Sequence, residues 1–288
     1  FLIYINDLPD NVSSTVRLFA HDCAIYRNIK CFNDHSALQN DLDLTFRWCE
    51  TWQMSLNASK CKLISFTRKH NNSAFHYKIN NAVVSATPSY KYLGVHLISG
   101  LSWTTHIAAV SSKASQSLGY LRRNLRNAPS NVRALSYITY VRPQLEYASS
   151  TWSPYQDYLV RMLEAVQNRA ARFISGNYDY HSSITLIKQD LAFQSLEIRR
   201  NIALLCLFHR YIYSNNIHCL PLYSPARTSQ RIHNARSFMR IHGHTQAFNL
   251  SSLPRAIAYW NGLPDHVVSI CNREIFRDNL NSLHSSIV

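Results

Sequence analysis

The hydrophobic pattern of this chain changes its period near Thr104, and this change limits the folds that the chain can adopt. Before Thr104, short runs of β-branched and aromatic residues alternate with Asn, Asp and Gly, a pattern typical of strands and turns. After Thr104, apolar residues recur every three or four positions, as in amphipathic helices. We therefore predict an α+β fold, in which an antiparallel sheet with a helix precedes a helical part.

Two stretches of the N-terminal part predict β-hairpins. The stretch 15–27 has two β-rich runs around the polar residues His21 and Asp22, so we expect these residues at the tip of a hairpin. The stretch 76–85 has two runs around an Asn-Asn dipeptide, which tolerates the positive φ of a tight turn.

Further strands and one helix are expected in the same part. We expect single strands at 60–66 and 90–97, and Gly94 within the second indicates a bulge or a close backbone approach. Asp34 is the expected N-cap of a helix. The residues on one face of this helix are Leu38, Leu42, Cys49 and Trp52.

The remaining sequence predicts helices whose apolar stripes form the core. Four stripes are apparent: Ile107, Val110, Ala114, Leu118 and Leu121; Val132, Leu135, Ile138 and Leu145; Leu159, Met162, Val166, Ala170 and Phe173; Ile198, Ile202, Leu205 and Ile212. Pro143 is expected to kink or end the second helix. Residues 221–237 predict a loop, and two short helices are expected near 253–268 and 272–283.

The charge of the chain favours a polyanionic partner. Its net charge is +14, and residues 105–210 alone carry 13 basic and 6 acidic residues, a net charge of +7. Most of these cations are Arg, whose planar guanidinium binds two phosphate oxygens at once. A solvated basic helical surface would give the same composition, and the sequence alone leaves this alternative open.

No apolar run approaches the roughly 20 residues that span a bilayer, so we expect no membrane partner. The N-terminus does not resemble a signal peptide, and the seven cysteines form no CxxC pair, so free thiols are expected. We expect an intracellular protein of the nucleus or cytoplasm.

Several segments, in this order, carry a resemblance to a known family. They are FLIYINDLP, VRLFAHDCAIY, LNASKCKLISF, YKYLGVHL and LPRAIAYWNGLP. Together they resemble the reverse transcriptase, an RNA-directed DNA polymerase and nucleotidyltransferase, of non-LTR (LINE-like) retrotransposons. The resemblance implies a C-terminal fragment of that enzyme, because the family's fingers and upstream catalytic Asp are expected to precede Phe1.

The resemblance also implies a division into domains. Residues 1–104 would be a truncated palm, from the catalytic hairpin to the primer grip. Residues 105–220 would be an α-helical thumb, and residues 221–288 a small C-terminal region.

The family's catalytic hairpin normally reads Phe-Ala-Asp-Asp, whereas this chain has His21 in place of the first Asp. Nucleotide addition uses two Mg²⁺ ions, which prefer hard carboxylate oxygens. A neutral imidazole offers one softer nitrogen and cannot bridge two such ions. Asp22 keeps the matching metal ligand. We therefore expect that the Mg²⁺ of the family is not bound here and that the chain is catalytically inactive.

The resemblance assigns two more parts of the active site. Lys60 matches the lysine that protonates the leaving pyrophosphate, and a solvated Lys at the start of a strand is the alternative. Tyr92, Leu93, Gly94 and Val95 match the primer grip, and a plain core strand is the alternative there.

The family's partners are RNA and RNA–DNA duplexes, namely the element transcript and its target DNA. Arginines that lie off the apolar stripes are the candidates for binding them. They are Arg122, Arg123, Arg126, Arg161, Arg169 and Arg172. Two alternatives to an inactive reverse transcriptase fragment stay open: a non-catalytic RNA- or DNA-binding module, and a non-functional transposon relic.

Overall fold

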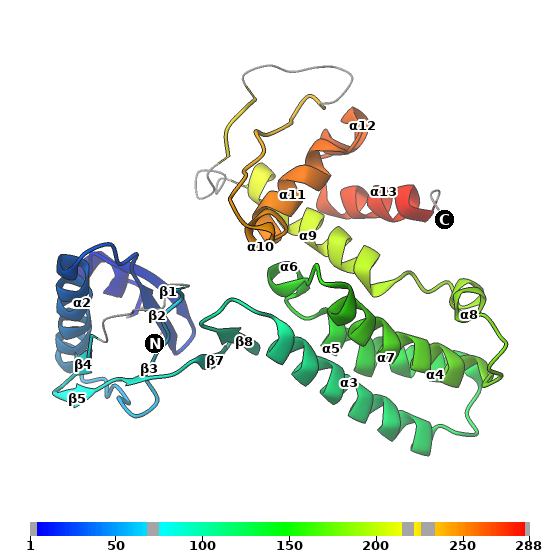
Figure 1. Cartoon of the computed structure of the whole chain (residues 1–288), viewed down its shortest axis with the longest axis horizontal. Helices are drawn as coiled ribbons and strands as arrows, with labels where there is room; N and C mark the ends of the chain where they lie inside the picture. Colours follow the sequence, from blue (N-terminus) through cyan, green and yellow to red (C-terminus); the bar gives the residue numbers. More distant parts are fainter. Residues whose placement is uncertain (1–4, 68–74, 215–221, 226–233, 286–288) are drawn as a thin grey trace. The chain divides into compact units, whose positions relative to one another are not determined.

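The structure, a computed structural model, describes residues 5–67, 75–214, 222–225 and 234–285. It divides the chain into two compact units, Phe1–Ser102 and Trp103–Val288, which we call the N-terminal and C-terminal units (Figure 1). In the described residues, the first contains short strands and one long helix, and the second contains helices. The predicted mixture of α and β structure is therefore confirmed.

The strands of the N-terminal unit form four separate pairs. In chain order the elements are a 3-10 helix Leu8–Asn11, β1 Thr15–Phe19, β2 Asp22–Tyr26, α2 Phe32–Thr51, β3 Lys62–Leu63, β4 Lys78–Ile79, β5 Ala82–Val83, β6 Ser85–Ala86, β7 Ser89–Tyr92 and β8 Val95–Ile98. The pairs β1–β2, β4–β5 and β7–β8 are antiparallel, whereas β3 and β6 pair in parallel. Among the described residues the strands do not join into the single antiparallel sheet that we expected, and each strand has at most five residues.

Two-residue turns with positive φ close the three hairpins. Ala20, at φ 50°, begins the turn between β1 and β2, and Asn80 and Asn81, at 46° and 60°, form the predicted turn between β4 and β5. Leu93 and Gly94, at 46° and 84°, form the third turn. The expectation of one strand over 90–97 with a bulge is therefore wrong, because two successive positive φ values reverse the chain.

Helix α2 begins about one turn earlier than we predicted from Asp34. Its N-cap is Cys31, and Asp34 is the third residue of the helix. The Asp34 carboxylate accepts hydrogen bonds from the backbone N–H groups of Lys30 (2.8 Å) and Cys31 (3.0 Å), a capping-box arrangement. These bonds lower the pKa of Asp34 to about 2. The N-cap prediction for Asp34 is wrong, although its capping role is real.

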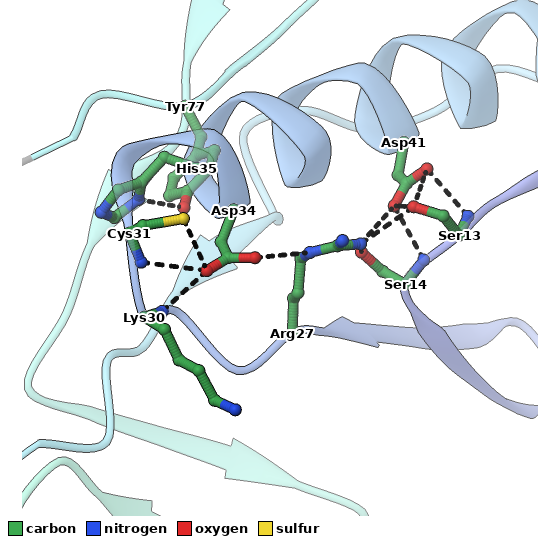
Figure 2. Close-up of polar contacts among 9 residues, drawn as sticks. All are labelled: Ser13, Ser14, Arg27, Lys30, Cys31, Asp34, His35, Asp41 and Tyr77. Carbon is green, nitrogen blue, oxygen red and sulfur yellow. Dashed lines mark hydrogen bonds and ion pairs between the residues drawn. The ribbon is translucent and has the colours of Figure 1, made fainter.

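A buried carboxylate ties α2 to the chain before β1. Asp41 is 1% exposed and accepts hydrogen bonds from the backbone N–H groups of Ser13 (2.9 Å) and Ser14 (2.8 Å) (Figure 2). The Arg27 guanidinium lies 3.8 Å from the same carboxylate. Burial alone would raise the pKa of Asp41, but the hydrogen bonds from the two serines outweigh it and lower that pKa.

All regular secondary structure in the described residues of the C-terminal unit is helical. Its elements are α3 Thr104–Asn124, α4 Ser130–Ser136, a π-helix Tyr137–Val141, α5 Arg142–Glu146, α6 Ser149–Trp152, α7 Asp157–Ser175, α8 Ile184–Asp190, α9 Leu196–Tyr213, α10 Gln246–Asn249, α11 Ser252–Asn261, α12 Asp265–Val268 and α13 Arg273–Ser285. The two short helices expected near the C-terminus correspond to α11–α12 and α13. Much of the loop expected at 221–237 lies outside the described residues.

Helices α3 and α7 lie side by side and run in the same direction (Figure 1). Near their starts, the Thr104 and Tyr158 hydroxyls are 3.2 Å apart, and further along, Arg169 donates to the Ser115 hydroxyl at 2.8 Å. The first predicted stripe is largely confirmed, since all of its members except Val110 are buried. In the third stripe Met162 is 37% exposed, and Leu163 takes its place in the core.

The second predicted stripe is wrong in its first half. Val132 and Leu135 are exposed, and the residues that enter the core are Tyr137, Val141 and Leu145. The predicted stripe assumed one continuous α-helical period from Val132 to Leu145, and the π-helix between these residues adds a residue to one turn and breaks that period. Pro143 follows this segment in the first turn of α5, where its missing N–H is tolerated.

A core cluster of twelve buried residues joins α9 to the C-terminal helices. Trp260 of α11 and Phe276 of α13 are fully buried against Phe208 and Ile202 of α9. Residues assigned by sequence to the thumb and to the C-terminal region thus share one core.

We predict that Asp41→Ala lowers the free energy of unfolding of the N-terminal unit by about 3 kcal/mol, because it leaves buried donors without an acceptor. The folded pKa of Asp41 is below its unfolded value, so this contribution is present above about pH 4 and is lost as the pH falls through the folded pKa. Native-state hydrogen exchange of the α2 amides along a urea series measures the loss. Glu50→Ala, an exposed change on the same helix, is the control and should alter stability by less than about 0.5 kcal/mol.

We also predict that the N-terminal unit unfolds more readily than the C-terminal unit. Its described core consists of two clusters of four buried residues each, whereas the cluster around Trp260 has twelve. Smaller buried apolar area gives less stabilisation. In hydrogen exchange, amides of β1, β2 and α2 should exchange faster than those of α7 and α9. The opposite order would contradict this ranking.

Candidate catalytic hairpin and nucleic-acid interface

The β1–β2 hairpin places His21 and Asp22 at an exposed tip. In its register Phe19 pairs with Asp22, so Ala20 and His21 form the turn and Asp22 is the first residue of β2. The His21 side chain is 87% exposed and that of Asp22 49%, and the imidazole Nε2 lies 3.9 Å from the Asp22 Oδ1. The predicted hairpin is therefore confirmed, with the two polar side chains next to each other.

The donor groups at this tip do not fit a pair of magnesium ions. Two Mg²⁺ ions need bridging carboxylates in near-octahedral geometry. The tip offers one carboxylate and one imidazole, and a nitrogen ligand suits softer metals better than Mg²⁺. Within the part of the chain that the structure describes, no group of three or more His, Cys, Asp or Glu side chains could hold a metal ion.

The residues matched to the primer grip lie at the β7–β8 turn. Val95 is buried, Tyr92 and Leu93 are half-buried, and Gly94 is exposed. Burial raises the pKa of Tyr92, and the nearby negative charge of Asp22 raises it further. The β7–β8 turn is thus close enough to the β1–β2 hairpin for the two to interact electrostatically.

Lys60 is exposed and lies in a turn before β3. Its backbone N–H donates to the carbonyl of Asn57 at 3.1 Å. Among the described contacts, its ammonium group makes none with Asp22. The structure therefore leaves both interpretations of Lys60 open.

A polar network at the base of the hairpin had no counterpart in the sequence analysis. It borders an open pocket of about 440 Å³, lined among others by Ser13, Ser14, Lys30 and Asp34 (Figure 2). Arg27 also lines this pocket. Its guanidinium lies 3.6 Å from the Asp34 carboxylate and donates a hydrogen bond to the Ser13 hydroxyl at 2.9 Å. Ser13 is also hydrogen bonded to Asp41, 28 positions further along the chain, so no local pattern could have predicted the network.

The six predicted nucleic-acid-binding arginines differ in what they contact. Arg122, Arg123 and Arg126 are exposed at the end of α3, and Arg161 and Arg169 are exposed on α7. They make few contacts: Arg169 donates to Ser115, Arg161 to the carbonyl of Asp157 at 3.4 Å, and the Arg122 guanidinium lies 5.9 Å from the centre of the Tyr178 ring.

Arg172 is half-buried and makes more hydrogen bonds within the chain than the others do. Its guanidinium donates to the carbonyls of Asp179 (2.8 Å), Ser182 (3.1 Å) and Asn177 (3.5 Å). Arg133, which the sequence analysis did not select, similarly donates to the carbonyls of Arg126 (2.7 Å) and Phe173 (2.9 Å). Both side chains hold loops at the C-terminal ends of α3 and α7, where Arg122 also lies.

Comparison with known proteins identifies the relatives of this chain. It is 28% identical over 188 residues to the probable RNA-directed DNA polymerase from transposon X-element of Drosophila melanogaster, an alignment that covers 61% of this chain and 20% of that protein. It is 26% identical over 190 residues to the RNA-directed DNA polymerase from mobile element jockey of Drosophila funebris, covering 61% and 20%. The jockey protein of Drosophila melanogaster is 24% identical over 233 residues, covering 76% and 24%.

The chain is similar to the RNA-directed DNA polymerases of non-LTR transposons. The resemblance inferred from the motifs is thereby confirmed. The matched regions span about a fifth to a quarter of these relatives. No family model matches the chain, and no solved structure gives a significant match. Among the described helices, none is both long and apolar enough to cross a membrane.

Proposed function

We propose that this chain is a segment of a retrotransposon RNA-directed DNA polymerase that binds nucleic acid through its helical unit and does not catalyse nucleotide addition. The observation that carries the proposal is the similarity to transposon polymerases, which act on nucleic acid according to their names. In this proposal the N-terminal unit corresponds to the end of a palm, and α3 and the helices around it correspond to a thumb.

The end of α3 is the surface that best suits a nucleic-acid duplex. Arg122, Arg123 and Arg126 lie within five positions, all are exposed, and the neighbouring end of α7 adds Arg169. Arg122 and Arg123 belong to the last turn of α3, and Arg126 lies in the turn that follows the helix. Such a cluster contacts phosphates, which carry no sequence information, and we therefore propose binding to RNA–DNA or double-stranded RNA without sequence preference.

The proposed lack of catalysis rests on the chemistry of the hairpin tip. Catalysis by two metal ions needs more than one carboxylate at the place where the hairpin presents Asp22. The adjacent side chain is an imidazole, and its Nε2 lies beside the one carboxylate that is present. We propose that the hairpin keeps its backbone geometry while its metal-binding chemistry is lost.

We predict that the chain binds an RNA–DNA duplex with an affinity that falls steeply with salt, and that replacing Arg122, Arg123 and Arg126 by Ala weakens this dependence. Each phosphate contact contributes about −0.9 to the log–log slope, so the slope should become shallower by up to about 2.7. Fluorescence anisotropy with a labelled duplex at several salt concentrations measures the slope, and circular dichroism checks that helicity is kept.

The matched control replaces Arg240, Arg273 and Arg277, which are exposed arginines of the same unit, by Ala. This variant loses the same charge, so an equal change of slope in both triple variants would show that only net charge matters. If the unmodified chain does not bind any duplex at low salt, the binding proposal fails and the relic alternative stands.

We further predict no primer extension on a homopolymer template, with Mg²⁺ or with Mn²⁺. His21→Asp should not restore activity, because among the described residues no third acidic side chain joins the tip. Incorporation of labelled nucleotide is the measurement, and Asp43→Ala, an exposed change on α2, is the control. Extension that persists in the control but disappears in Asp22→Ala would refute the proposal.

A further inference from the structure

The connection between α7 and α8 presents two tyrosine rings to solvent. In residues 177–182, which we call the tyrosine loop, Tyr178 is 58% exposed and Tyr180 is 91% exposed. Two exposed rings two positions apart offer flat apolar area whose burial by a ligand is favourable. In Figure 1 this connection follows the C-terminal end of α7, which lies beside the C-terminal end of α3.

The tyrosine loop is held by a dense set of hydrogen bonds, although its rings are exposed. Arg172 donates to three of its carbonyls, as described above, and the Asn177 amide donates to the Ser182 hydroxyl at 3.0 Å. The Asp179 carboxylate accepts from the backbone N–H of His181 at 3.0 Å, and the Asn177 side chain accepts from that of Asp179 at 3.0 Å. These bonds fix the backbone that carries the two tyrosines, so a ligand loses little entropy in ordering the loop itself.

The surroundings of the rings are cationic. The Arg122 guanidinium lies over the Tyr178 ring, Arg123 follows it on α3, and Arg126 lies in the turn after α3. The acidic residue of the loop, Asp179, is already hydrogen bonded within it. A ligand that fits must therefore offer flat apolar faces together with negative charge. Unpaired nucleobases on a phosphate backbone have both properties, because bases stack on aromatic rings and phosphates pair with Arg.

We propose that the tyrosine loop binds unpaired bases of single-stranded RNA or DNA, which stack on Tyr178 and Tyr180 while the adjoining phosphates contact Arg122 and Arg123. This inference rests on the proposed nucleic-acid binding and adds a second kind of contact to it. The arginines of α3 hold paired nucleic acid through its backbone, whereas the tyrosine loop holds bases that are not paired.

The test compares two labelled substrates, a blunt RNA–DNA duplex and the same duplex with a single-stranded extension, made once as RNA and once as DNA. The variant is Tyr178→Ala with Tyr180→Ala in the full chain. Loss of stacking should weaken binding of the extended duplex by roughly 5- to 150-fold per stacked base. Binding of the blunt duplex should not change, and the salt slope should be the same, because no charge is removed.

Two further variants separate stacking from unfolding. Tyr178→Phe with Tyr180→Phe keeps the rings and should retain the affinity for the extended duplex. Tyr140→Ala removes a tyrosine that is 67% exposed on the π-helix of the same unit and should have no effect. The inference is supported if the double Ala variant loses affinity for the duplex with the RNA extension, with the DNA extension or with both. The extension that shows the loss identifies which nucleic acid the tyrosine loop binds.

The inference is overturned if the double Ala variant binds the extended duplex as well as the unmodified chain does. It is also overturned if the loss is equal for the blunt duplex, or if Tyr140→Ala gives the same loss. These outcomes leave the proposed duplex binding intact. Absence of binding to both substrates by the unmodified chain would instead refute the proposed function itself.

Discussion

The packing of α3 against α7 determines where the cations of the C-terminal unit lie. The contacts between Thr104 and Tyr158 and between Ser115 and Arg169 both join residues 54 positions apart, so the two helices run side by side in the same direction. Their C-terminal ends therefore coincide. The macrodipoles of both helices place partial negative charge at these ends. Basic residues near the ends of both helices offset this charge, and they remain exposed to a polyanion.

Much of the local structure could be predicted because it depends on side-chain periodicity and turn chemistry. The Asn80-Asn81 turn and the 15–27 hairpin follow from residues that tolerate positive φ or favour strands. Two of the errors arise because a local change of backbone geometry is invisible to side-chain periodicity. The π-helix Tyr137–Val141 breaks the regular period that would place Leu135 and Leu145 on one face, and Leu93 adopts a positive φ that a leucine seldom takes.

The candidate site could be predicted only where its residues are adjacent in sequence. His21 and Asp22 lie together because the hairpin turn puts them together, and this turn depends on the backbone of Ala20 rather than on a carboxylate at position 21. The tip can therefore keep its geometry after its chemistry has changed. In contrast, the link from Asp41 to Ser13 and Ser14 depends on how α2 packs, which no pattern of neighbouring residues specifies.

The net charge of +7 over residues 105–210 overstates what a phosphate backbone can contact. Arg133 and Arg172 donate to backbone carbonyls, and Arg199 pairs with both oxygens of Glu146. Arg200 is 1% exposed, and none of its three side-chain nitrogens is hydrogen bonded within the described part of the chain. Guanidinium groups that are already paired or buried release few counterions when a duplex binds. The arginines that can set the salt dependence are thus those that remain exposed with few partners. Within residues 105–210 Arg161 lies near the start of α7, whereas Arg122, Arg123, Arg126 and Arg169 lie toward the common end of α3 and α7, where the tyrosine loop also lies.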